Sequence, residues 1–140
     1  MRTIDVKEII EKHQLDAKEV AQQLFPGNKY PKLALNRVMA GSAQLDANQM
    51  SKLALLIGVQ VSDLYSGSEW KATSKKDLIS FSSGSYRAEL NTKTWITKIF
   101  DNDSLFHESV IHAGSTALSE YLNELNLIIS KHKKDESSRN

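Results

Sequence analysis

Hydrophobic residues in the first half of the chain recur with the spacing of short amphipathic helices. An apolar face that begins at Val6 continues at positions 9 and 10 and predicts a first helix. Asp16 and Glu19 have the spacing of a capping box, in which each side chain bonds a free amide at the start of a helix. They predict a second helix, which ends before Pro26 and Gly27.

Two more helices and a final turn follow. Pro31 at the start and Gly41 just past the end predict a helix over residues 31–40. Asp46 predicts the start of another helix, and Gly58 its end. A single further turn is expected before residue 66, so that five short helices form a compact helical unit over residues 1–66.

The pattern changes after a small, polar and basic stretch at residues 67–76, which predicts a linker. Beyond it, apolar and polar residues alternate, as in half-buried strands. Turn residues divide this region into two strand pairs, which gives a short antiparallel sheet of about four strands. The expected strands are 77–82, 85–91, 94–100 and 105–111.

A long amphipathic helix is predicted near the end of the chain, and residues 135–140 are expected to form a flexible tail. Two interpretations of its apolar stripe stay open: it covers one face of the sheet of its own chain, or it joins two copies of the chain. The candidate dimerisation residues are Leu118, Tyr121, Leu122, Leu125, Ile128 and Ile129. The strands and this helix form a second region over residues 77–134. The predicted fold is therefore mainly α with a small α+β second half.

Composition narrows the class of protein. The chain has 140 residues, 18 basic and 17 acidic groups, and no cysteine. Its 40% of hydrophobic residues exceeds what a disordered protein contains. Disulfides and thiolate chemistry are excluded, and no apolar run approaches the roughly 20 residues of a membrane-spanning helix. The charged N-terminus does not read as a signal peptide. We expect a cytoplasmic protein with no membrane partner.

Short motifs between residues 16 and 65 stand in a definite order. They are Lys18-Glu19-Val20-Ala21, Leu24, Leu35-Asn36-Arg37-Val38 with Gly41, and Leu53-Ala54 with Gly58-Val59 and Leu64. In this order the segment resembles the lambda-repressor-like, Cro-type helix-turn-helix domains of the XRE family. The resemblance implies a transcriptional regulator of phage or bacterial type that binds operator DNA, most often as a repressor.

One departure from that family concerns the connection between the two motif helices. Residues 25–30 make it roughly four residues longer than the usual tight turn. The glutamine that commonly begins the recognition helix is replaced around Lys32.

The distribution of charge favours DNA independently. No acidic residue occurs between Glu19 and Asp46, which suits a surface that faces phosphates. Asn and Arg side chains can pair with adenine and guanine, and Lys and Tyr suit phosphates. The candidate DNA-binding residues are Lys29 and Tyr30 for phosphates, and Lys32, Asn36 and Arg37 for the major groove or its walls.

The expected partners are double-stranded DNA and a second copy of the chain, because one short helix reads too few base pairs for useful specificity. We expect no enzymatic activity, cofactor or metal site. Trp95, Phe100 and Phe106 are interpreted as core residues, not as a pocket for a small effector. The alternative function is a protein-interaction module, either antitoxin-like or a phage accessory protein. It is favoured by the balance of eight basic and eight acidic groups over residues 1–70.

Overall fold

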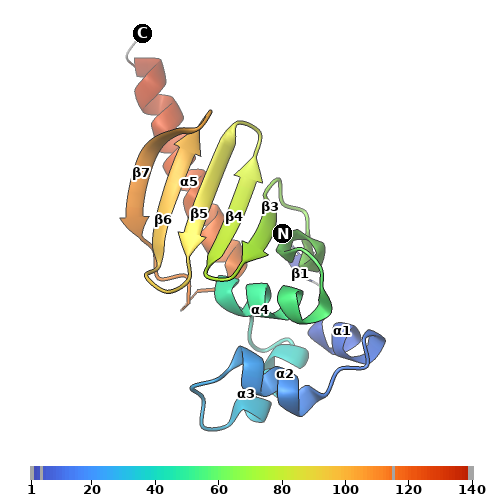
Figure 1. Ribbon diagram of the computed structural model, residues 1–140. Coiled ribbons are helices and arrows are strands. Elements are labelled where there is room, and N and C mark those ends of the chain that lie inside the picture. The colour runs from blue at the N-terminus through green and yellow to red at the C-terminus, as the bar shows by residue number, and fades with distance from the viewer. Residues whose placement is uncertain (1, 4, 115, 139–140) are drawn as a thin grey trace.

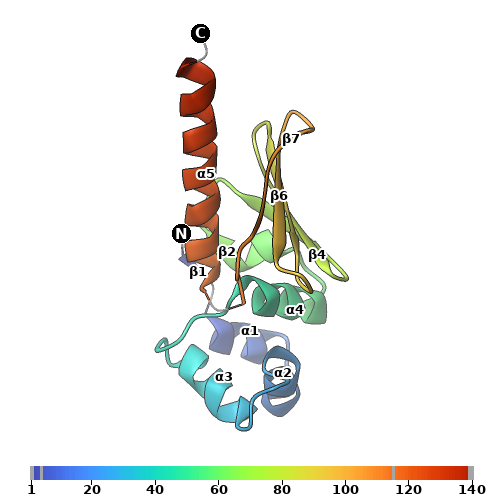
Figure 2. The ribbon, with the colours of Figure 1, turned by 90° about the vertical axis from the view of Figure 1, so that its left-hand side faces the viewer.

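The computed structural model describes residues 2–3, 5–114 and 116–138. A group of short helices forms one end of the molecule, and an antiparallel sheet rises from it (Figure 1). The long helix α5 (Leu118–Ser138) runs along one face of this sheet, and Figure 2 shows it in profile. The C-terminal end of α5 lies at the opposite end of the molecule from the short helices (Figure 1).

Four short α-helices and one 3-10 turn build the helical end. The helices are α1 (Val6–Lys12), α2 (Ala17–Leu24), α3 (Pro31–Met39) and α4 (Ala47–Ile57), and the turn is η1 (Val61–Leu64). Asp5, Asp16 and Asp46 cap the starts of α1, α2 and α4 by accepting hydrogen bonds from backbone amides. The predicted helices are thus confirmed, although the fifth is a 3-10 turn.

Strand β1 (Arg2–Thr3) pairs antiparallel with β2 (Tyr65–Ser66). This two-stranded ribbon joins the beginning of the helical unit to its end. Sequence reasoning did not anticipate it, because two residues are too few to show a period of two.

The main sheet has five strands in the order β3-β4-β5-β6-β7, so the prediction of about four strands was wrong. Its strands are β3 (Lys71–Lys75), β4 (Leu78–Ser83), β5 (Tyr86–Asn91), β6 (Ile96–Asp101) and β7 (Ser104–Val110). The extra strand, β3, lies inside the predicted linker and pairs with β4 along its whole length. Its sequence KATSK buries only Ala72 fully, so the alternation was not visible.

Tight turns connect the paired strands. Asn102 and Asp103 join β6 to β7 with φ of 49° and 66°, the left-handed values that a type I′ hairpin turn requires. Asn and Asp adopt this conformation more readily than other residues that carry a side chain. The turn predicted between these strands is confirmed.

Helix α5 covers the sheet of its own chain. Five of the six candidate dimerisation residues are buried in the single chain, namely Leu118, Tyr121, Leu122, Leu125 and Ile129, and Ile128 is half-buried. Tyr121 lies 5.3 Å from the ring of Phe81 on β4, and its hydroxyl is 2.8 Å from that of Thr97 on β6. A dimer contact through this stripe would have to displace the sheet, so that assignment is not retained.

The predicted linker and tail are also corrected. Trp70 is buried, and its indole N–H donates to the side-chain oxygen of Asn126 on α5 at 2.8 Å. The buried residues of the helical unit and of the sheet form one continuous core. Residues 67–76 are therefore not a flexible tether. Residues 135–138 of the predicted tail continue α5, and residues 139–140 lie outside the described part.

No helix in the described part of the chain combines the length and the apolar character needed to cross a membrane.

Candidate nucleic-acid interface

Helices α2 and α3 and the loop between them form the motif that the sequence singled out. Six residues, 25–30, connect the two helices. The Asn28 side chain orders this loop by accepting a hydrogen bond from the Tyr30 amide at 2.8 Å, and the Asn28 amide donates to the Phe25 carbonyl. Leu35 anchors α3 because its side chain is completely buried. The opposite side of α3 faces solvent at the end of the molecule farthest from the sheet (Figure 1).

All five candidate DNA-binding residues are exposed. On α3, Lys32, Asn36 and Arg37 lie within one arc of about 140° that does not include Leu35, as the 3.6-residue repeat requires. Residues 26–30 of the loop are themselves exposed, and they leave this arc uncovered.

The structure brings three of the five candidates together. Lys29, Tyr30 and Lys32 line a shallow hollow of about 520 Å³ between α2 and the start of α3. The ammonium of Lys29 lies 5.7 Å from the centre of the Tyr30 ring. Lys18 of α2 lines the same hollow, together with Gln22.

Lys18 is a candidate site residue that the sequence did not single out, although it lies in the motif Lys18-Glu19-Val20-Ala21. The available signal was the spacing of Lys18 and Gln22, four residues apart on one face of α2.

Arg37 lies elsewhere on the arc. It lines a separate hollow of about 290 Å³ that also includes Asp46 and Gln49 at the start of α4. The side chain is in the last turn of α3, where the negative end of the helix dipole stabilises a positive charge. Burial raises the pKa of the Asp46 carboxyl above its ordinary value, and hydrogen bonds from the Gln49 and Asn48 amides oppose that rise. Arg37 is thus separated from the hollow that Lys29 and Lys32 share.

Unneutralised positive charge characterises the interface. The ion pairs found among the described residues lie in the sheet and α5, and none of them uses Lys29, Lys32 or Arg37. Tyr30, the residue before α3, makes no side-chain hydrogen bond that caps the helix. Free amides at a helix start favour anions, and the two lysines add to that preference.

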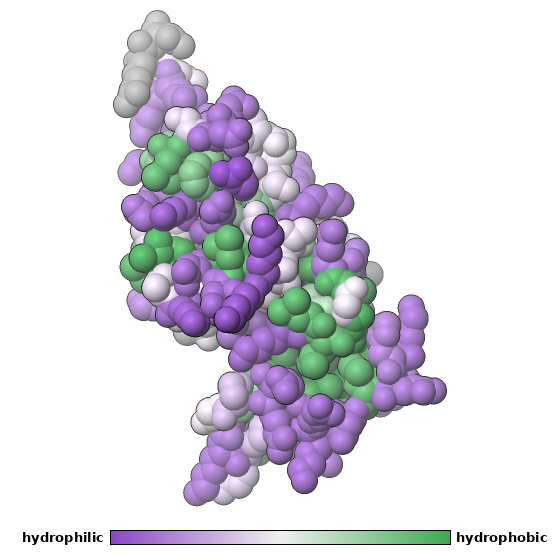
Figure 3. Space-filling view, in the orientation of Figure 1, coloured by the Kyte–Doolittle hydropathy of each residue, from purple (hydrophilic) through white to green (hydrophobic). Residues whose placement is uncertain are grey.

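Two exposed apolar side chains interrupt this polar surface. Tyr30 is 61% exposed and Leu33 is 50% exposed. Leu55 and Leu56 of α4 are further exposed apolar side chains. Figure 3 shows a hydrophobic area near the middle of the molecule, with a mainly hydrophilic surface below it.

The three aromatic residues weighed as a small-molecule pocket have separate contacts. Phe100 lies under the Arg87 guanidinium at 4.4 Å, and Phe106 stacks on His132 at 3.7 Å. Trp95 stands next to Gly114, where even a Cβ atom would come within 2.7 Å of the indole ring. Each ring thus packs against side chains or backbone of the protein itself.

Comparison with known proteins adds no relative to this description. No family model, no curated protein and no solved structure matches the chain. The resemblance to the helix-turn-helix family therefore stays a prediction from the motifs in residues 16–65.

Proposed function

We propose that the protein is a sequence-specific DNA-binding regulator of phage or bacterial type that acts as a repressor in the cytoplasm. The observation that carries this proposal is the exposed, acid-free face of α3, which the long loop before it leaves open. A helix of nine residues that is anchored by Leu35 on one side and exposed on the other has the dimensions to enter the major groove.

The residues divide by the contacts they can make. Lys32 and Asn36 lie on α3, where side chains reach base edges, and Asn can pair with both hydrogen-bonding groups of adenine. Lys18 and Lys29 line one hollow beside the start of α3 and suit a phosphate, and the free amides of a helix start favour the same negative charge. Arg37, on the flank of the helix, suits a phosphate or the wall of the groove.

A homodimer is part of the proposal, because two copies of α3 about 34 Å apart would read two half-sites. With the stripe of α5 buried, the contact must use another surface. Strand β7 is a free edge of the sheet, and its side chains Leu105 and Val110 are 50% and 54% exposed. Sedimentation of the wild type and of Val110→Lys tests this assignment: we expect a dimer and a monomer, respectively.

The test of DNA recognition is selection from a pool of random-sequence duplexes at physiological salt, followed by sequencing of the bound fraction. We expect one enriched site with two-fold symmetry. Lys32→Ala/Asn36→Ala should abolish the enrichment. Lys93→Ala, which changes an exposed lysine in the turn between β5 and β6, is the matched control and should enrich the same site. Uniform recovery of sequences by the wild type would contradict specific recognition.

A protein-interaction module is the second candidate, and the exposure of Tyr30 and Leu33 favours it. Exposed aromatic and aliphatic side chains side by side are typical of protein contacts. If no duplex binds, pull-down with the wild type and with Leu33→Ser tests this alternative. A partner that the wild type retains and Leu33→Ser loses would support it.

A further inference from the structure

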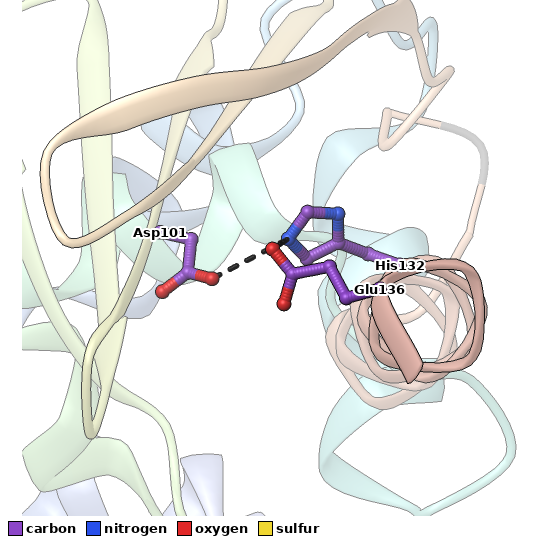
Figure 4. A group of neighbouring side chains, drawn as sticks. All are labelled: Asp101, His132 and Glu136. Carbon is purple, nitrogen blue, oxygen red and sulfur yellow. Dashed lines mark hydrogen bonds and ion pairs between the residues drawn. The ribbon is translucent and has the colours of Figure 1, made fainter. Parts of the chain in front are cut away.

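Three ionisable side chains converge where the far end of α5 meets the sheet. Asp101 ends β6, and His132 and Glu136 lie one turn apart on α5 (Figure 4). The Nε2 atom of His132 is 3.3 Å from Oδ2 of Asp101 and 3.3 Å from Oε1 of Glu136. All three atoms lie within 4.8 Å of one another.

The two separations from His132 fit a tetrahedral zinc ion. Zinc binds imidazole nitrogen and carboxylate oxygen at about 2.0–2.2 Å, so two donors on one ion stand about 3.3–3.5 Å apart. Both measured distances from His132 have this value. One neutral imidazole and two carboxylates also balance the charge of a divalent cation.

Two of the three side chains are held in place by neighbours. The ring of Phe106 on β7 stacks on the imidazole of His132 at 3.7 Å with an angle of 15° between the rings. The Ser85 hydroxyl lies 3.3 Å from Oδ1 of Asp101 and can donate a hydrogen bond to it, which leaves Oδ2 toward His132. Metal ligands are characteristically oriented by such outer contacts.

Protein hydrogen bonds alone do not satisfy this arrangement. Nε2 of His132 carries at most one proton, yet two carboxylate oxygens lie at equal distances from it. A cation bound between the three donors would offset the repulsion between the two carboxylates.

We propose that Asp101, His132 and Glu136 bind one Zn²⁺ ion, with water completing the coordination. The ion would fasten the last turns of α5 to the hairpin formed by β6 and β7. The end of β6 and the last turns of α5 lie away from α3, beyond the middle of the molecule (Figure 1), and the inference does not depend on DNA binding.

The binding test is titration of metal-free protein, purified without a histidine tag, against Zn²⁺ in competition with a chromophoric chelator. We expect one ion per chain at micromolar or lower free zinc. Hydrogen exchange of the amides in residues 131–138 should slow on addition of zinc, because the ion fixes this part of α5 to the sheet. Absence of binding at 100 micromolar zinc would overturn the proposal.

Variants assign the bound ion to this site. Glu136→Gln changes a half-exposed side chain at the end of α5, so the fold should survive and zinc affinity should fall by more than about 100-fold. Ser85→Ala should weaken binding by about 10-fold, since it removes only an outer contact.

Two controls should leave zinc affinity unchanged. Glu124→Gln changes an exposed glutamate three turns earlier on the same helix, and His107→Gln changes a histidine of β7 that bonds Ser109 instead. Zinc binding that resists Glu136→Gln, or that is lost in His107→Gln, would overturn the assignment.

Discussion

Asn36 lies inside the exposed arc of α3, one turn after Lys32, and is the residue best suited to read a base. We predict that Asn36→Ala weakens binding to the selected DNA site by about 1–3 kcal/mol, because a bidentate contact with adenine is lost. Affinity for random duplexes should change little. Fluorescence anisotropy with both duplexes measures the difference, and an equal loss on both would assign Asn36 to the DNA backbone.

Lys29 is predicted to contact a phosphate, since it lies in the loop beside the start of α3 and not on the helix itself. Lys29→Ala should weaken binding to all sequences alike. The slope of log affinity against log salt should fall by about one, as expected for one counterion fewer released. An unchanged slope would remove Lys29 from the interface. Lys93→Ala, far from α3, is the control.

Tyr65 makes the free energy of unfolding depend on pH in the alkaline range. Its hydroxyl donates to the Trp70 carbonyl, and burial raises its pKa from 10.0 to about 12. The folded state therefore favours the protonated phenol. Its contribution to stability is complete below pH 10 and is lost as pH rises toward 12.

Urea unfolding at several pH values between 8 and 11.5 checks this prediction. The free energy of unfolding of the wild type should fall above pH 10, and Tyr65→Phe should show a shallower fall because one titrating group is absent. Tyr30→Phe, at an exposed tyrosine, should keep the steep dependence. An identical fall in Tyr65→Phe and the wild type would contradict the prediction.

Side-chain clusters were harder to predict from the sequence than single exposed residues. Lys29, Lys32 and Asn36 were identified because they are close in sequence, and the structure exposes all three. Asp101 and His132 are 31 residues apart, so only the packing of α5 on the sheet brings them together. The four-residue spacing of His132 and Glu136 is visible in the sequence, but it occurs on many solvated helices.

Elements with local start and stop signals were predicted well. Asp46 and Gly58 bracket α4, and both act within one turn of the helix end, so the sequence contains the whole signal. Strand β3 has no such signal, because its partner β4 supplies the hydrogen bonds. For the same reason the sheet was predicted one strand short.

The cap of α4 is the element-scale prediction. Asp46 accepts from the Gln49 amide at 2.7 Å, and Gln49 in turn accepts from the Asp46 amide at 3.0 Å. Asp46→Ala should lower the free energy of unfolding by about 1 kcal/mol. Asp46→Asn should preserve it, because asparagine keeps the acceptor and avoids a charge that burial disfavours. Urea unfolding measures both, and a free energy of unfolding that Asp46→Ala leaves unchanged would show that the cap does not stabilise the helix.

At the scale of the whole molecule, the amphipathic pattern of α5 does not show which surface its apolar stripe covers, and only the assembled fold does. The stripe of α5 from Leu118 to Ile129 has the same pattern whether it covers a sheet or a second helix. The structure buries it on the sheet of its own chain. The predicted linker was wrong for a related reason: in a polar stretch one residue, Trp70, packs between distant elements, and a composition average does not show it.

The segment around Trp70 should therefore make the helical unit and the sheet unfold together. Trp70→Ala is predicted to lower the free energy of unfolding by about 3–5 kcal/mol, since it leaves a large cavity in the shared core. Lys71→Ala, at the exposed neighbour, should change it by less than about 0.5 kcal/mol.

The cooperativity of unfolding tests the same point in the wild type, where circular dichroism reports the helices and fluorescence reports Trp70 and Trp95. The unfolding curves in urea that the two probes give should coincide, because the helical unit and the sheet share one core and unfold in a single transition. Two separate transitions, together with a Trp70→Ala variant as stable as the wild type, would contradict this prediction. They would show that residues 67–76 form a flexible linker and that α3 can move relative to the sheet.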